Sequence, residues 1–176
     1  SASVPLVAGT LAGLLSREPG LKPDEAVDVL LKNSDDAGAP GRDPQFGCGI
    51  LDVRRVLDRG VKGIRDIAIV DNVISGPPTG EGDVELVVSI QNRGTERLSG
   101  VDLSVRIGVY RSGTGVPGID VGETLGFRFL TRVNEEGSAG GIRVVSEVSI
   151  RGARDDFPSN NSKETVLTIP PRVGPQ

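Results

Sequence analysis

The chain has 176 residues, of which 36% are hydrophobic and 25% charged, as is typical of a globular protein with one large or two small domains. Its net charge of −4 argues against a nucleic-acid partner, because phosphate binding requires clustered Lys and Arg. It has no run of about 18 apolar residues, so the sequence encodes no membrane-spanning helix.

The first predicted helix covers residues 4–16, and Pro5 suits its first turn, where a missing N–H costs nothing. The helix has almost no polar face, because apolar side chains stand at Val4, Leu6, Val7, Ala8, Leu11, Ala12, Leu14 and Leu15. A helix that is apolar all round is normally buried inside a larger protein. We therefore expect residues 4–15 to be exposed, repacked or engaged in self-association in this chain.

A second helix is predicted from Pro23 to about residue 32, with Asp24 and Glu25 favourable at its positive end. The side chains that it is expected to bury are Ala26, Val27, Leu30 and Leu31. A turn-rich loop over residues 33–43 then leads to a short helix over residues 53–57. A solvated face is predicted for the arginines of this region, which are Arg42, Arg54, Arg55 and Arg59.

Residues 65–170 are predicted to form an all-β module. Alternation of apolar and polar residues indicates half-buried strands at residues 66–73, 84–92, 101–110, 125–131, 142–150 and 164–169. Six or seven short strands over about 105 residues indicate an immunoglobulin-like sandwich. The predicted turns lie at Pro77-Pro78, Gly80, Gly82, Gly113, Gly115, Gly118 and residues 137–141. Residues 171–176 are predicted to be a tail without a core of its own.

Three motifs follow one another in the N-terminal segment. They are Ser-x-Ser-x-Pro-x-Val-Ala-Gly at residues 1–9, Pro-x-Leu-Lys-Pro-x-Glu at residues 19–25 and Gly-x-Gly at residues 47–49. Together they resemble the C-terminal end of the catalytic domain of subtilisin-like serine proteases, the subtilases. The departures are Ala2, Ser3 and Val4, where that family usually has Met, Ala, and Ser or Thr. The resemblance implies that residues 1–64 are a helical C-terminal remnant of an α/β subtilase domain.

The β module resembles the CARDB family, a bacterial immunoglobulin-like domain named for a link to cell adhesion. The residues that carry this resemblance are the start Asp66-Ile67-Ala68-Ile69, the turn region 88–95 and the acidic stretch 155–162. The central turn reads Asn92-Arg93-Gly94. Turn chemistry alone also selects Asn and Gly at such positions.

The subtilase resemblance places the reactive serine at Ser1. The Asp and His of that family lie upstream of the serine, and this chain contains no His. Serine needs an adjacent base, so we expect the isolated chain to be inactive, with Asp and His supplied by a missing N-terminal part. Two alternatives stay open: Ser1 or Ser1-Ala2 is a cloning remnant, or the α-amine of Ser1 acts as the base. The lack of Met predicts an N-terminus produced by cleavage, processing or design.

No cofactor is expected, although two acidic clusters could bind calcium. The clusters are Asp35-Asp36-Asp43 and Asp155-Asp156-Asn160-Asn161. Ordinary solvated turns are the favoured interpretation, because neither cluster has the spacing of a calcium-binding loop. Cys48 has no His partner and is expected to be a small buried hydrophobic residue, and zinc is unsupported.

Two functional hypotheses result. In the first, the chain is part of a secreted subtilisin-like serine endopeptidase that cleaves protein or peptide substrates through an acyl-enzyme at Ser1. In the alternative, it is a non-catalytic β-sandwich binding or adhesion module with a helical packing or oligomerisation segment. Both hypotheses place the protein outside the cell, and both predict no proteolysis by this chain alone.

Overall fold

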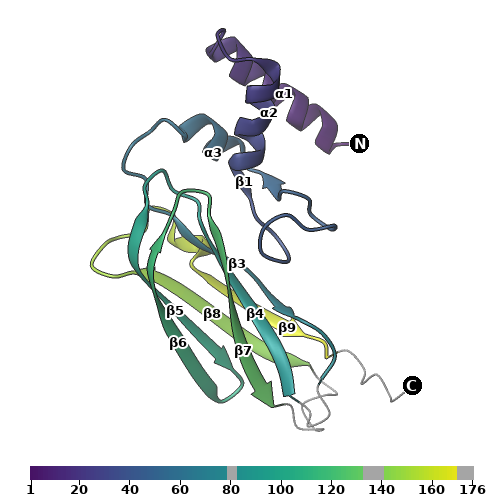
Figure 1. The fold of residues 1–176 in the computed structure, drawn as a ribbon, viewed down its shortest axis with the longest axis vertical. Coiled ribbons are helices and arrows are strands. Elements are labelled where there is room, and N and C mark those ends of the chain that lie inside the picture. The colour runs from purple at the N-terminus through teal and green to yellow at the C-terminus, as the bar shows by residue number, and fades with distance from the viewer. Residues whose placement is uncertain (79–82, 133–140, 170–176) are drawn as a thin grey trace.

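The computed structural model describes residues 1–78, 83–132 and 141–169. A helical segment, residues 3–58, lies at one end of an elongated β-sandwich (Figure 1). Its elements are α1 (Ser3–Arg17), α2 (Pro23–Lys32), β1 (Ser34–Asp35), β2 (Ile50–Leu51) and α3 (Val53–Asp58). The short strands β1 and β2 pair antiparallel, which places the start of α3 beside the end of α2.

The sandwich has seven strands in the described residues. They are β3 (Ile67–Ile74), β4 (Asp83–Asn92), β5 (Leu98–Ile107), β6 (Tyr110–Ile119), β7 (Thr124–Arg132), β8 (Ile142–Ile150) and β9 (Ser162–Leu167). One sheet has the order β3-β4-β7 and the other β6-β5-β8-β9, with all neighbours antiparallel. A 3-10 helix, η1 (Pro158–Asn160), precedes β9. The predicted all-β sandwich is therefore confirmed.

Alternation along the strands builds the sandwich core. Strand β4 buries Val84, Leu86, Val88 and Ile90, and from the facing sheet β5 buries Val101, Leu103 and Val105. The intervening residues of β5 point outward, as the twofold repeat of a strand requires. Branched aliphatic side chains fill this core, as expected for a chain with only 3% aromatic residues.

The prediction that Gly113, Gly115 and Gly118 lie in turns is wrong, because all three lie in strand β6. Among the described strands β6 lies at the edge of its sheet and pairs only with β5. Its backbone bonds form the ladder without buried side chains along its first half. The strand predicted over residues 101–110 ends at Ile107. The turn to β6 contains Gly108, whose φ of 58° favours glycine.

The helical segment has a small core of its own, formed by Leu14, Ala26, Leu30 and Val56. This core is too small to cover α1, and the exposed fractions of Val4, Leu6 and Val7 are 70%, 54% and 39%. The exposure expected for the first helix is therefore confirmed in its N-terminal half.

Two details of the helical segment differ from the prediction. Val27 and Leu31 of α2 are exposed, so the burial predicted for them is wrong, because α2 packs through a single face around Ala26 and Leu30. The predicted turn residues Gly80, Gly82 and 137–140, and the predicted tail 171–176, lie outside the described residues. Among the helices that the structure describes, none is long and apolar enough to span a membrane.

Candidate functional site at the junction of the helical segment and the sandwich

The helical segment contacts the sandwich through buried polar side chains. We define this polar junction by Ser34, Asp35, Asp36, Arg55, Gln91 and Arg93. The first four residues belong to the helical segment, whereas Gln91 and Arg93 lie at the end of β4 and in the turn that follows. A buried polar contact is costly unless every group is paired, so the pairing here decides how firmly the two parts are joined.

Arg55 of α3 is the central cation of the junction. Asp52 is the N-cap residue of helix α3, and its side chain accepts a hydrogen bond from the Arg55 backbone N–H at 3.1 Å. The Arg55 side chain is 2% exposed, and Nη1 donates to the Ser34 carbonyl at 2.7 Å and to Asp35 Oδ1 at 2.9 Å. Its Nε donates to the Arg93 carbonyl at 3.2 Å. The solvated role predicted for Arg55 is therefore wrong, because the fold encloses it between β1 and the sandwich.

Arg93 and Gln91 complete the junction from the sandwich side. Arg93 Nη1 lies 3.0 Å from Asp35 Oδ2, so the two oxygens of Asp35 bridge two guanidinium groups. Burial lowers the pKa of Arg93, and the charge of Asp35 opposes that shift. Gln91 Oε1 accepts from the Asp36 backbone N–H and from Arg93 Nε, both at 3.0 Å, and Gln91 Nε2 donates to the Ser34 carbonyl at 3.3 Å.

A second buried contact flanks the junction at Asp66, which precedes β3 and is 0% exposed. Its Oδ2 lies 3.2 Å from Nη2 of Arg54, and its Oδ1 accepts from Asn160 Nδ2 at 2.9 Å. The Arg54 guanidinium also stacks 3.7 Å from the centre of the Phe157 ring. Burial raises the pKa of Asp66, the hydrogen bond from Asn160 opposes this, and the charge of Asp155 adds to it.

The raised pKa of Asp66 predicts an unusual pH dependence of stability. Because its pKa in the fold lies above the ordinary 3.8, the folded protein binds a proton before the unfolded chain does as the pH falls. The cost of burying the charge is fully present above the raised pKa and is lost as the pH approaches 3.8. We expect the free energy of unfolding of the wild type minus that of Asp66→Asn to rise as the pH falls, measured by urea denaturation.

The exposed Glu164 provides a control of opposite sign. Hydrogen bonds of 2.7 and 2.8 Å from Arg143 lower the pKa of Glu164. The wild type minus Glu164→Gln difference should therefore decrease as the pH falls, because that stabilisation is lost on protonation. A pH-independent difference for Asp66→Asn would contradict the assignment of a raised pKa to Asp66.

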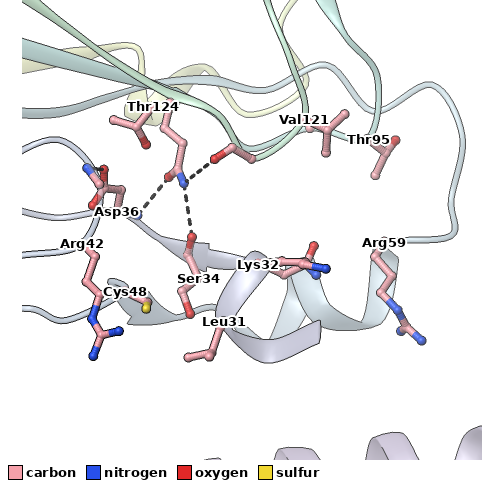
Figure 2. Close-up of a pocket in the computed structure, with 15 residues that line it drawn as sticks. Leu31, Lys32, Ser34, Asp36, Arg42, Cys48, Arg59, Thr95, Val121 and Thr124 are labelled. Carbon is pink, nitrogen blue, oxygen red and sulfur yellow. Dashed lines mark hydrogen bonds between the residues drawn. The ribbon is translucent and has the colours of Figure 1, made fainter. Parts of the chain in front are cut away.

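A pocket of about 510 Å³ opens beside the junction. Figure 2 shows Ser34 and Asp36 on the helical side of this pocket, facing Val121 and Thr124 from the sandwich. Other lining residues are Leu31, Lys32, Arg42, Cys48, Arg59 and Thr95. Arg59 is occupied by an ion pair with Glu18. Cys48 is partly exposed to this pocket, which corrects its predicted burial.

Ser1 lies at the exposed start of the chain, outside the polar junction. Ser1 is exposed and precedes α1, and the chain has no His to act as its base. Ala2 occupies the N-cap position of α1 without a side-chain hydrogen bond. The role assigned to Ser1 by resemblance therefore stays a prediction.

The first acidic cluster is used in turns and ion pairs. Asp36 Oδ1 accepts from the Ala37 N–H at 3.0 Å, and its Oδ2 accepts from the Gly41 N–H at 2.7 Å. Asp43 Oδ1 accepts from the N–H groups of the second and third residues after it, as in an Asx turn. Asp35 is engaged by the two junction arginines.

The second acidic cluster fastens the loop before β9 to the start of β3. Asp155 Oδ2 accepts from the Ile67 N–H at 2.8 Å, and Asp156 Oδ2 accepts from the Arg65 N–H at 2.9 Å. Local turn bonds are thus found at Asp36 and Asp43, whereas Asp155 and Asp156 hold backbone N–H groups far away in the sequence. Asp36 and Asp155 are buried, so the solvated setting predicted for them is wrong. No group of three or more His, Cys, Asp or Glu side chains suited to a metal ion occurs in the part of the chain that the structure describes.

Sequence reasoning missed Gln91 and Arg93 as functional residues of the junction. Gln91 lies on the outward face of β4, where a polar side chain is ordinary, and Arg93 lies in a turn, where a charge is ordinary. Their partners in the helical segment, Asp35 and Asp36, are more than fifty positions earlier in the chain. No local pattern could have indicated the contact.

Comparison with known proteins supports the fold of the sandwich. No family model matches the chain. A domain of a protein provisionally described as a cell surface protein of Methanosarcina acetivorans is similar with a TM-score of 0.50 and 14% identity, over 62% of this chain and 96% of that chain. The CARDB domain of PF1109 from Pyrococcus furiosus, in complex with di-metal ions, has a TM-score of 0.49 and 14% identity, over 60% of this chain and 89% of that chain. At this identity the likeness concerns the fold alone.

A curated protein matches 33% of the chain by sequence. Over 58 residues the chain is 40% identical to the Neisserial autotransporter lipoprotein NalP of Neisseria meningitidis, in two strains. The match covers 33% of this chain and 5% of NalP, so the chain spans only a small part of that relative. The fold and the junction together define a β-sandwich module with a helical segment fastened to one end.

Proposed function

We propose that this chain is a non-catalytic, extracellular β-sandwich module that holds its helical segment in a fixed orientation. The observation that carries the proposal is the polar junction, in which Asp35, Arg55 and Arg93 are paired between the two parts. A rigid ionic contact of this kind suits a positioning element, because it specifies one geometry more than it adds stability. The structural likeness to the cell surface protein of Methanosarcina acetivorans and the sequence likeness to the autotransporter lipoprotein support a location outside the cell.

Absence of catalysis is the direct test of this proposal. We expect a fluorophosphonate probe to label the chain no more than it labels the Ser1→Ala variant, because Ser1 lacks a His base. Hydrolysis of casein should equal that of the same variant, with a bacterial serine protease as the positive control. Labelling that disappears specifically in Ser1→Ala would overturn the proposal and favour the α-amine of Ser1 as a base.

We further propose that the exposed half of α1 is a self-association surface. Val4, Leu6 and Val7 are exposed apolar side chains in the first turns of α1, the helix that begins at the N-terminus marked in Figure 1. The subtilase resemblance of residues 1–58 agrees with this proposal, since it implies that such a helix is buried in the parent fold. The same resemblance also fits the hypothesis that a longer protein, of which this chain is a part, is a serine endopeptidase.

Light scattering tests whether the exposed half of α1 causes self-association. We expect the wild type to form dimers or larger species, and the Val4→Glu/Leu6→Glu variant to be monomeric. The melting temperature of the variant should match that of the wild type at dilutions where the wild type is monomeric. The variant removes apolar area without touching the buried residues Leu14 and Leu30. A wild type that stays monomeric at the concentrations used for NMR would contradict self-association.

A further inference from the structure

The two lateral sides of the sandwich differ in how they are closed. On the side of β3, Asn72 Oδ1 accepts from Ser146 Oγ of β8 at 2.6 Å, and Asn72 Nδ2 donates to Thr165 Oγ1 of β9 at 3.2 Å. Lys163 Nζ donates to the Val70 carbonyl at 3.0 Å and lies 2.7 Å from Asp71 Oδ1. These bonds hold the sheets together along this side.

The opposite side, between β6 and β7, is open. Among the described strands, β6 pairs only with β5 and β7 pairs only with β4, so both present an unpaired backbone edge. A groove of about 580 Å³ lies between these edges and reaches the core residues Val105 and Ile107. Residues 110–113 of β6 are exposed on both faces, which shows that nothing in the described residues covers this half of the strand.

Apolar and aromatic side chains gather at this groove, which we call the β6/β7 groove. The chain has only four Phe and one Tyr, and Tyr110 and Phe129 both line it. Tyr110 is 69% exposed, and Leu130, also in the lining, is 76% exposed. Large apolar side chains beside an unpaired strand edge are usual where another strand is added, because the edge supplies hydrogen bonds and the side chains supply area.

The charges of the groove differ in sign from the whole chain. Its lining contains Arg111, Arg128 and Arg132 and no Asp or Glu, whereas the chain has a net charge of −4. Glu85 lies 3.1 Å from Arg128, and Asp83 lies 3.1 Å from Arg132, on the outer face of the neighbouring strand β4. These two carboxylates offset two of the three lining cations, so the lining and its ion-paired neighbours keep a net excess of one positive charge, which is complementary to an acidic ligand.

We propose that the β6/β7 groove binds an extended acidic peptide segment of a partner protein, which adds as a strand along β7. β7 is the receiving edge because its sequence, residues 124–132, contains no Pro and no acidic residue. β6 contains Pro117 and three glycines, which weaken pairing along that strand. Alternate side chains of the peptide enter the groove beside Phe129, and the acidic side chains between them face the arginines.

An NMR titration with a model peptide tests this proposal. The probe is an eight-residue peptide that alternates Val and Glu and has blocked ends, added to the ¹⁵N-labelled full chain. We expect saturable shifts of β7 amides and slower hydrogen exchange of those amides in the complex. The matched peptide with Lys in place of Glu should bind about tenfold more weakly, because its positive charges are repelled by the arginines of the groove.

Charge variants of the chain locate the site. Arg111→Glu/Arg128→Glu should weaken binding of the acidic peptide by about tenfold or more, whereas Arg154→Glu, on an exposed loop after β8, should leave it unchanged. The spectrum of each variant shows directly whether it is folded.

Several outcomes would overturn this binding site. They are no saturation at millimolar peptide, equal binding of the Lys peptide, shifts confined to α1, or stronger binding of a heparin oligosaccharide than of the peptide. The site rests on the sandwich acting as a non-catalytic binding module. The two fail separately, since loss of peptide binding leaves the hydrolysis and labelling results unchanged.

Discussion

Replacing Arg55 by Met should lower the free energy of unfolding by about 3–5 kcal/mol, the usual effect of removing one partner from a buried ion pair. The side chain is 2% exposed and donates to two backbone carbonyls as well as to Asp35. Met fills a similar volume without donating, so the carbonyls of Ser34 and Arg93 lose a donor where water has little access.

The design of the measurement separates the junction from general effects. Urea denaturation gives the change in stability, and Arg154→Met serves as a control on an exposed loop, where a change within about 0.5 kcal/mol is expected. Hydrogen exchange should show amides of α3 and β1 losing protection before those of β4. If Arg55→Met costs no more than Arg154→Met, the junction does not hold the two parts together.

A double-mutant cycle with Asp35→Asn identifies the ionic part of this effect. Asp35 also binds Arg93, so its own substitution should weaken the junction even when Arg55 is present. The coupling energy between the two sites should lie in the range of about 0.5–3 kcal/mol that is usual for residues in one network.

The sequence predicted those elements whose signals are local. Helix α2 begins at Pro23 and ends at Lys32 as predicted, because its cap and its apolar repeat lie within ten residues. Strand β8 was likewise predicted with its observed bounds, residues 142–150. β6 was missed because an edge strand needs few buried side chains, so its glycines favoured turns over a strand.

The candidate site could not be predicted in the same way. Arg55 follows Val53 and Arg54 in a short helix, and its partners Ser34 and Arg93 lie 21 and 38 positions away. Only the tertiary fold brings these residues together, and an arginine in a short helix is normally solvated. By contrast, the acidic turns were predicted because each carboxylate of Asp36 and Asp43 bonds backbone N–H groups close to it in sequence.

In the turn that follows β4, we expect one added methyl group at Gly94 to lower the free energy of unfolding. A Cβ atom on Gly94 would lie 2.4 Å from the Ile64 carbonyl oxygen and 3.0 Å from the Asp66 nitrogen. Both are backbone atoms, and the Thr95 N–H holds the Ile64 carbonyl with a bond of 2.9 Å. Neither can move without breaking the start of β3. We expect Gly94→Ala to lower the free energy of unfolding by about 1–3 kcal/mol or more.

The neighbouring Asn92 makes relief of this clash harder. It is fully buried, its Oδ1 accepts from the Gly94 N–H at 3.0 Å, and its Nδ2 donates to the carbonyls of Glu96 and Ile119. The backbone at Gly94 is therefore fixed from both sides. The glycine is required here for close approach of two chain segments, whereas the sequence pattern alone suggested only the conformation of a turn.

Gly9→Ala is the matched control, because it adds the same methyl group in open space. Among the described residues, and apart from its chain neighbours and the nearby backbone of its own helix, no atom lies within 4 Å of a Cβ built on Gly9, which stands in the interior of α1. There alanine should stabilise the helix by up to about 1 kcal/mol. Thermal and urea denaturation of the two variants should shift in opposite directions. If Gly94→Ala is as stable as the wild type, the backbone around Ile64 can yield, and the close contact at Gly94 does not specify the turn.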